Sequence, residues 1–198
     1  MKVLPWAPVA AAVALVGCAA TKPADRLVTM RLSPAVPVSE TSRIPDAITV
    51  APVQGRGLAG ATRYTYIDSA TPSELRQAAT LRWEESPTAV VERALTASLR
   101  TRFASVAGAA MGLPSARRVV AYLDRFEETG AGGAARATVA IDVTVTGKPL
   151  LAGRYCASAP VLSASSTDRA RAFESAIASV VARFAQDFAS GELGGTTC

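Results

Sequence analysis

Three cysteines, Cys18, Cys156 and Cys198, stand in a sequence that has no histidine. Histidine is the usual general base and the commonest metal ligand, so both kinds of site lose their first candidate. No cysteine pair has Cys-x-x-Cys or zinc-site spacing, and there is no Ser-x-x-Lys pair. Glu127 and Asp142 fall on expected strands, but nothing links them as catalytic carboxylates. The sequence therefore predicts no enzyme activity, no metal and no cofactor.

Cys18 has a different chemistry, because it closes the run Leu15-Val16-Gly17-Cys18 after an apolar stretch from Val3 to Val16. That stretch is too short to span ~30 Å of hydrocarbon as a helix, and it reads as a signal peptide over residues 1–17. The run resembles a bacterial lipobox. The resemblance implies cleavage before Cys18, a diacylglyceryl group on its sulfur and a fatty acyl group such as palmitate on its nitrogen, which together anchor firmly. The alternative is a secreted protein with an unrelated cysteine near an ordinary cleavage site.

With Cys18 acylated, the remaining thiols are those of Cys156 and Cys198. In an oxidising compartment two leftover cysteines can pair. The alternative is two free thiols, one on a strand and one on a loose tail. Sequence does not give the Cα separation that a disulfide needs, so both readings stay open.

The formal net charge is +5, and the basic residues are mostly arginines. For an exported protein this favours anionic lipid headgroups or acidic partners, and not nucleic acid. The arginines can equally be the solvated faces of helices, for example Arg100, Arg102, Arg169 and Arg171.

Six runs have the composition or alternation of strands: 27–32, 48–53, 63–67, 118–126, 137–146 and 150–157. The last three form an expected antiparallel meander. Its middle strand points four apolar residues one way, Val139, Ile141, Val143 and Val145. Its polar residues point the other way, Thr138, Asp142, Thr144 and Thr146. We expect this polar face to stay uncovered by helices.

Two segments have helical periodicity. The first begins at Ser86-Pro87, ends before Gly108 and carries the stripe Val91, Leu95, Leu99 and Phe103. The second is capped by Thr167 or Asp168, stops at Gly191 and carries Phe173, Ile177, Val180, Phe184 and Phe188.

Together these elements predict an α+β fold. We expect a two-layer domain with a mixed or antiparallel sheet of about six strands and two amphipathic helices on one face. The predicted organisation is a signal peptide at 1–17, a tether at 18–25, one domain at 26–190 and a flexible tail at 191–198.

The run Gly55-Arg56-Gly57-Leu58-Ala59-Gly60 has the letters of a dinucleotide-binding fingerprint. That fingerprint needs a helix to begin at the glycines, whereas residues 62–67 are strand-like. We therefore expect a hairpin or crossover loop here.

The middle of the chain resembles a known family. The resemblance rests on Arg63-Tyr64-Thr65-Tyr66, Pro72-Ser73-Glu74-Leu75, Leu81-Arg82-Trp83-Glu84-Glu85-Ser86-Pro87 and Leu123-Asp124-Arg125-Phe126-Glu127. These runs resemble the ABC-type transport auxiliary lipoproteins, which include the paraquat-inducible protein C group. The similarity extends over roughly residues 26–190 and departs from the family at residues 55–60.

The resemblance implies a binding role. Such proteins are periplasmic partners of ABC systems that move lipids between the two membranes of Gram-negative bacteria, beside proteins with mammalian-cell-entry (MCE) domains. Some members form rings, which implies a homo-oligomer, and the fold is similar to the N-terminal domain of the Tol-Pal translocation protein B. Ala19 stands where aspartate would retain a lipoprotein in the inner membrane of many enteric bacteria, which favours the outer membrane and its periplasmic face.

The alternative function is a carrier that holds an acyl chain itself, which would need a large apolar cavity.

The motif residues Tyr64, Arg82, Trp83 and Pro87 are candidates for partner contact. Each also has a structural reading. Trp83 can be a core aromatic and Tyr64 half buried; Arg82 can pair with Glu84 or Glu85, and Pro87 can simply start a helix.

Overall fold

The computed structural model describes residues 26–36, 43–111, 117–147, 149–196 and 198. Cys18, the signal peptide and the tether lie outside these residues. The strands are β1 (Val28–Met30), β2 (Ile44–Val50), β3 (Gln54–Gly55), β4 (Arg63–Ile67), β5 (Leu75–Trp83), β6 (Phe103–Gly108), β7 (Arg117–Thr129), β8 (Arg136–Thr146) and β9 (Leu151–Pro160). The helices are α1 (Pro87–Arg100) and α2 (Ser166–Ser190), with short 3-10 turns at Ala109–Met111 and Gly132–Ala134.

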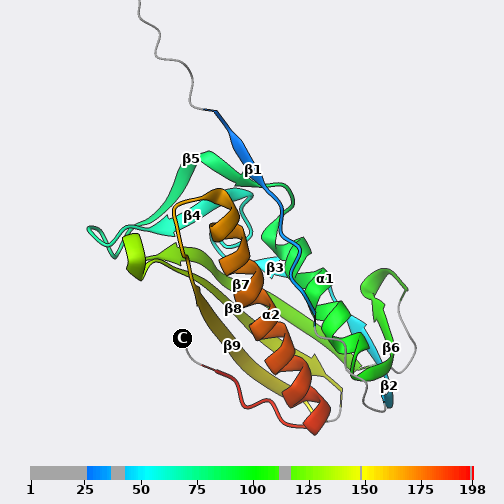
Figure 1. Ribbon diagram of the computed structural model, residues 1–198. Helices are drawn as coiled ribbons and strands as arrows, with labels where there is room; N and C mark the ends of the chain where they lie inside the picture. The colour runs from blue at the N-terminus through cyan, green and yellow to red at the C-terminus, as the bar shows by residue number, and fades with distance from the viewer. Residues whose placement is uncertain (1–25, 37–42, 112–116, 148, 197) are drawn as a thin grey trace, which may run out of the picture.

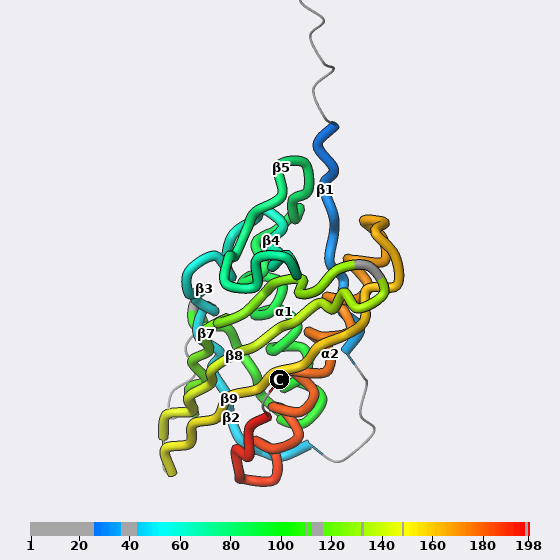
Figure 2. Tube along the Cα trace, turned by 90° about the vertical axis from the view of Figure 1, so that its left-hand side faces the viewer, coloured from blue at the N-terminus to red at the C-terminus, as the bar shows by residue number. Residues whose placement is uncertain are grey.

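All nine strands belong to one mixed sheet, and both helices cover the same face of it (Figure 1). The two-layer α+β prediction is confirmed, with more strands than the six expected. β7 organises the sheet. Along one side it pairs in parallel with β2, then β3, then β4; along the other it pairs antiparallel with β8, which pairs with β9. Figure 2 shows β7, β8 and β9 side by side, as the meander prediction required.

The strands that the sequence did not predict are β5, β6 and the two-residue β3. β5 reads Leu-Arg-Gln-Ala-Ala-Thr-Leu-Arg-Trp, with a single β-branched residue and no clean alternation. It is a strand because β4 pairs with its residues 75–77 and 82, and β1 pairs with its residues 81–83. Tertiary pairing thus outweighs its weak intrinsic preference.

Phe103 was predicted on the first helix, and that prediction is wrong. α1 ends with its C-cap at Thr101, and Phe103 opens β6. Phe103 is buried at helical spacing from Leu99 although it belongs to a strand. It packs from the sheet against Phe188 of α2, with ring centroids 4.9 Å apart.

Capping residues determine where the two helices begin and end. The Ser86 hydroxyl accepts a hydrogen bond from the Ala89 amide, with Pro87 in the first turn of α1. α2 is capped by Ser165 and not by the predicted Thr167 or Asp168, because Asp168 sits in the first turn and its amide bonds the Ser165 hydroxyl. Gly191 ends α2 with φ +86°, in the left-handed conformation that glycine adopts without strain.

The helices bury one face of the meander. Val139, Ile141, Val143 and Val145 are at most 1% exposed. The opposite face, which we call the outer face, is less open than its polar residues suggested: Asp142 and Thr144 are half-buried, and Thr138 and Ala140 are fully buried. No helix in the described part of the chain is long and apolar enough to cross a membrane.

The C-terminal tail (residues 191–198) was predicted to fray. In the structure its described residues lie along β9. The structure joins Cys156 on β9 to Cys198 by a disulfide, with 5.3 Å between the Cα atoms. The difference from the prediction arises from this covalent link, one of the two readings left open for these cysteines, and from hydrogen bonds of Thr196 to β9, which composition does not reveal.

Candidate functional site

Two of the family-motif residues lie inside the core. Tyr64 on β4 is 1% exposed and Trp83 at the end of β5 is 2% exposed. Their ring centroids lie 5.4 Å apart. Phe126 of β7 and Phe173 of α2 complete an aromatic cluster, stacked on each other at 4.5 Å. Aromatic pairs at these separations stabilise a core beyond their buried area, so the cluster fastens α2 to the β4–β5 end of the sheet.

A polar group is buried beside this cluster. The Tyr64 hydroxyl donates to the Glu128 carboxylate, which also accepts from Nε of Arg169 at 3.1 Å. The Arg169 guanidinium lies over the Tyr64 ring, 5.4 Å from its centroid. Burial raises the pKa of Tyr64 well above its ordinary value, and the bond to Glu128 adds to the rise. The phenol therefore stays protonated as a donor. We call Tyr64, Glu128 and Arg169 the buried triad.

The other two motif residues have local structural partners. Arg82 does not pair with Glu84 or Glu85; its Nε donates to Oγ1 of Thr29, 3.1 Å away on the neighbouring strand β1. Glu84 instead pairs with Arg31, and Glu85 with Arg93. Pro87 starts α1. The structure thus does not gather the motif residues into one exposed site.

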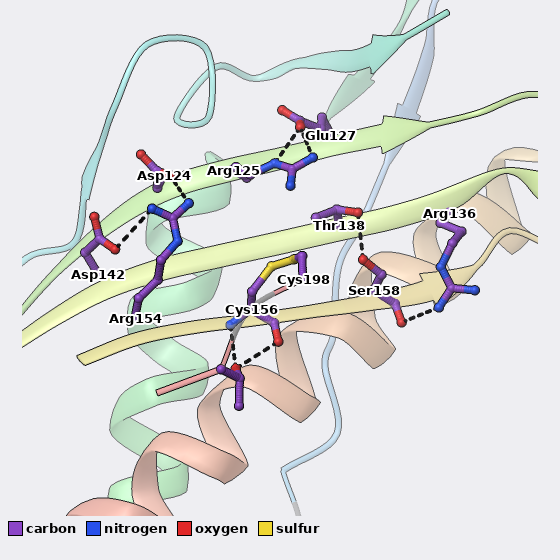
Figure 3. Close-up of a disulfide and its surroundings, with 11 residues drawn as sticks. Asp124, Arg125, Glu127, Arg136, Thr138, Asp142, Arg154, Cys156, Ser158 and Cys198 are labelled. Atoms are coloured by element: carbon purple, nitrogen blue, oxygen red, sulfur yellow. Dashed lines mark hydrogen bonds and ion pairs between the residues drawn. A yellow bond between two sulfur atoms is a disulfide. The ribbon is translucent and has the colours of Figure 1, made fainter. Parts of the chain in front are cut away.

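A different group of charges meets on the outer face. Arg154 of β9 bonds Asp124 of β7 at 2.5 Å and lies 3.7 Å from Asp142 of β8. Arg56 pairs with Asp142 and lies 3.6 Å from Asp124. These four residues, two arginines and two aspartates, form the outer network. Figure 3 shows Arg154 reaching between the two carboxylates. Each arginine side chain keeps about half of its surface exposed, at 49%.

The glycine-rich run brings Arg56 to this network. β3 pairs Gln54 and Gly55 with Tyr122 and Leu123 of β7, and the chain then turns at residues 57–60. A Cβ at Gly55 would lie 2.7 Å from the Gly60 backbone, so only glycine allows the loop to close on itself. The closed loop sets the Arg56 guanidinium 4.8 Å above the Tyr122 ring. Because no helix begins at these glycines, the run does not form the dinucleotide-binding fingerprint.

Asp124 reaches the network through an irregularity in β7. The β7–β8 register shifts between Leu123 and Arg125, and Asp124 lies at this bulge. Sequence analysis placed Asp142 on the polar face but did not select Arg56, Asp124 or Arg154. Strand alternation could have found Arg154, which lies directly across from Asp142. The bulge that places Asp124 and the loop closure that places Arg56 leave no comparable signal in the sequence.

The rest of the outer face is also polar and internally bonded. Arg125 pairs with Glu127 at 2.7 Å, and Thr138 shares a hydrogen bond with Ser158. Arg136 donates to the Ser158 carbonyl, and the Cys156–Cys198 disulfide lies between these pairs and the outer network (Figure 3). The described residues hold no cluster of potential metal ligands. This arrangement offers polar recognition, without a nucleophile and base in contact.

Two hollows among the described residues are open to solvent. One is bordered by Arg154, Arg183 and residues 194–196, and another by Arg136, Ser158, Ser179 and Arg183. Their charged borders do not suit an acyl chain. The space between helices and sheet is filled by side chains that are almost fully buried, including Tyr155, Phe173, Phe184 and Phe188.

Comparison with solved structures places the fold. Protein XCC0632 from Xanthomonas campestris superposes with a TM-score of 0.68 at 18% identity, over 80% of this chain and 92% of that one. A second crystal structure, of an uncharacterized protein, gives a TM-score of 0.61 at 14% identity, over 81% of this chain and 99% of that one. No curated protein matches the chain. At these identities the likeness shows the fold alone.

The family is shown by the sequence itself. The family model described as ABC-type transport auxiliary lipoprotein component matches residues 30–185. The match begins at the end of β1 and ends in the last turns of α2, so it includes most of the sheet and both helices. This is a family of transport auxiliary components and not a known enzyme family. The chain therefore belongs to the ABC-type transport auxiliary lipoproteins.

Proposed function

We propose that this protein is a lipid-anchored periplasmic auxiliary of an ABC system that moves lipids, and that it binds an MCE-domain component through the outer face of β7, β8 and β9. The family match carries the auxiliary role. The single structural observation that supports the binding face is the half-exposed outer network on the sheet face that both helices leave uncovered.

The outer network suits exchangeable protein contacts. Ion pairs at this exposure contribute only about 0–1 kcal/mol each, so a partner can replace them at little cost. Two arginines and two aspartates present both signs of charge, which fixes register and excludes partners with the wrong pattern. The side chains on this face of the sheet also bond to one another, which limits the ordering cost of binding.

The anchor in this proposal is an acylated Cys18 in the outer membrane, after removal of residues 1–17. The tether of residues 18–25 would then reach at most ~28 Å at full extension. It joins the domain at the start of β1, which projects from one end of the fold (Figure 1). Intact-mass analysis of membrane-extracted protein tests this part, and an unmodified N-terminus at another residue would reject it.

In-cell photocrosslinking tests the binding face. A photoreactive amino acid at Ala152 or Thr146 on the outer side of the meander should capture an MCE-domain component or another transporter subunit. The matched control is Gln186, which is exposed on α2. Capture from Gln186 but not from Ala152 or Thr146 would move the binding face to the helices. Capture of no transporter subunit from any position would argue against the proposed role.

The carrier alternative has a separate test. Lipid extraction followed by mass spectrometry of the purified protein should release only the acyl groups of the anchor. One further lipid per protein molecule would favour a carrier, despite the filled space between helices and sheet.

A further inference from the structure

The free edge of β9 is covered by the chain's own C-terminal tail. Among the described strands β9 pairs with β8 alone, so its other side could continue the sheet. Thr196 occupies that side with three hydrogen bonds. Its amide donates to the Arg154 carbonyl at 2.6 Å, and its hydroxyl accepts from the Cys156 amide at 2.9 Å and donates to the Cys156 carbonyl at 3.1 Å. An uncovered strand edge is a template for another chain, and covering it is one way in which proteins prevent such pairing.

The path of the tail is built for this contact. Gly191 turns the chain out of α2 with φ +86°, and Gly195 has φ +69°. A Cβ at Gly195 would lie 2.8 Å from the Arg154 carbonyl oxygen, so glycine is needed where the tail meets β9. Leu193 packs over Gly153, where an added Cβ would lie 3.2 Å from the Leu193 side chain. Leu193, Gly195 and Thr196 of the tail are thus fitted to β9.

The hydrogen bonds alone do not hold the tail strongly. They exchange for bonds to water when the tail leaves, whereas closure must order the backbone from Glu192 to Thr196. The disulfide between Cys156 and Cys198 removes most of that ordering cost, because it keeps the end of the tail beside β9 in every open state. Cys198 is exposed and Cys156 is buried, so an incoming thiolate reaches the sulfur of Cys198.

We propose that the C-terminal tail is a redox-sensitive cover, which the disulfide locks over the free edge of β9 and which a dithiol reductant opens. The first thiolate of the reductant attacks Sγ of Cys198 and expels the Cys156 thiolate, which takes up a proton. The second thiol of the reductant then closes its own disulfide and releases Cys198 as a thiol. Two electrons pass from the dithiol to the protein. Opening frees the backbone at Arg154 and Cys156, next to the outer network. The cover does not depend on which partner binds the outer face.

Hydrogen–deuterium exchange of the full chain, read at residue level, tests the cover. The Cys156 amide should exchange slowly in the oxidised protein and at least about tenfold faster after native treatment with dithiothreitol or in Cys198→Ser. The Ile141 amide should stay slow in every form, because β8 is paired on both sides. Thiol labelling under the same native conditions should increase by two thiols after reduction, those of Cys156 and Cys198.

Thr196→Val supplies the matched control. It keeps Cys156 and Cys198 and removes the hydroxyl, so the Cys156 amide should exchange faster while these two cysteines stay unreactive in the oxidised protein. Equal exchange of the Cys156 amide before and after reduction would overturn the proposal. So would a disulfide that dithiothreitol cleaves only after the whole domain unfolds.

Discussion

The buried triad and the outer network hold the same kinds of side chain at different exposures. On the helix side the Glu128 carboxylate keeps 10% of its surface exposed and Arg169 keeps 23%. On the outer side Arg56 and Arg154 keep 49% and their aspartates 23% and 27%. Exposure decides the consequence. A buried carboxylate that loses its partners has no water to replace them, whereas an exposed one is resolvated.

The residues that hold the fold together thus differ from the residues that are exposed for binding. Trp83 and Tyr64, two of the family-motif residues, belong to the buried side and hold α2 on the sheet. The outer network is not part of that motif, except for Asp124, and its side chains are more exposed than those of Glu128 and Arg169. Substitutions on the two faces should therefore affect different measurements.

The largest effect is expected for Trp83→Ala. Removing this buried indole leaves a cavity between Tyr64, Phe126 and Phe173, and should lower the free energy of unfolding by about 3–5 kcal/mol. Urea unfolding followed by circular dichroism measures the loss. Trp83→Phe, which keeps an aromatic ring, should cost less. A loss below about 1 kcal/mol for Trp83→Ala would contradict a core role.

Glu128→Ala should follow, with a loss of about 3 kcal/mol, because it leaves the Tyr64 hydroxyl and the Arg169 guanidinium without their shared acceptor. Glu128→Gln is the control. Its carbonyl can still accept from Tyr64, so it should retain part of the stability in the same urea titration. Equal losses in the two variants would show that charge, and not hydrogen bonding, holds the triad.

Alkaline pH should lower the free energy of unfolding through two tyrosines on the helix side of the sheet, Tyr64 and Tyr155. Burial raises the pKa of Tyr64 and of Tyr155 above the ordinary value of 10.0, and the bonds to Glu128 and Asp187 add to the rise. The unfolded chain loses these protons first, so the contribution to stability is complete below pH 10.0 and declines as the pH rises above it. Urea midpoints between pH 9 and pH 11 check this. Tyr64→Phe should flatten the decline, and an unchanged slope would assign it to other groups.

The smallest stability effect is expected for Arg154→Ala on the outer face, at less than about 1 kcal/mol. The same variant should lower crosslinking from Ala152 to the transporter subunit severalfold if the outer network contacts the partner. Arg100→Ala, an exposed arginine in the last turn of α1, is the control and should change neither measurement by more than a few tenths of a kcal/mol or a small fraction of the yield. Unaltered crosslinking in Arg154→Ala would remove the network from the binding face.

Periodicity and capping were sufficient for much of the fold. The alternation at residues 137–146 and the stripe from Phe173 to Phe188 predicted β8 and α2, because each reflects a single buried face of one element. Ser86-Pro87 predicted the start of α1 for the same local reason. Phe103 shows the limit of this logic, since a buried residue at helical spacing can belong to the next strand.

What the sequence by itself determined is therefore local: the elements with clear periodicity, the family through its short motifs and the lipobox-like run at Cys18. Only the tertiary structure decided that β5 is a strand, that Arg56, Asp124, Asp142 and Arg154 meet, and that the tail lies on β9. The physical reason is that these features depend on pairing between segments far apart in the chain, on one bulge and on one loop closure. Each involves backbone contacts whose partners leave no periodic trace in the sequence.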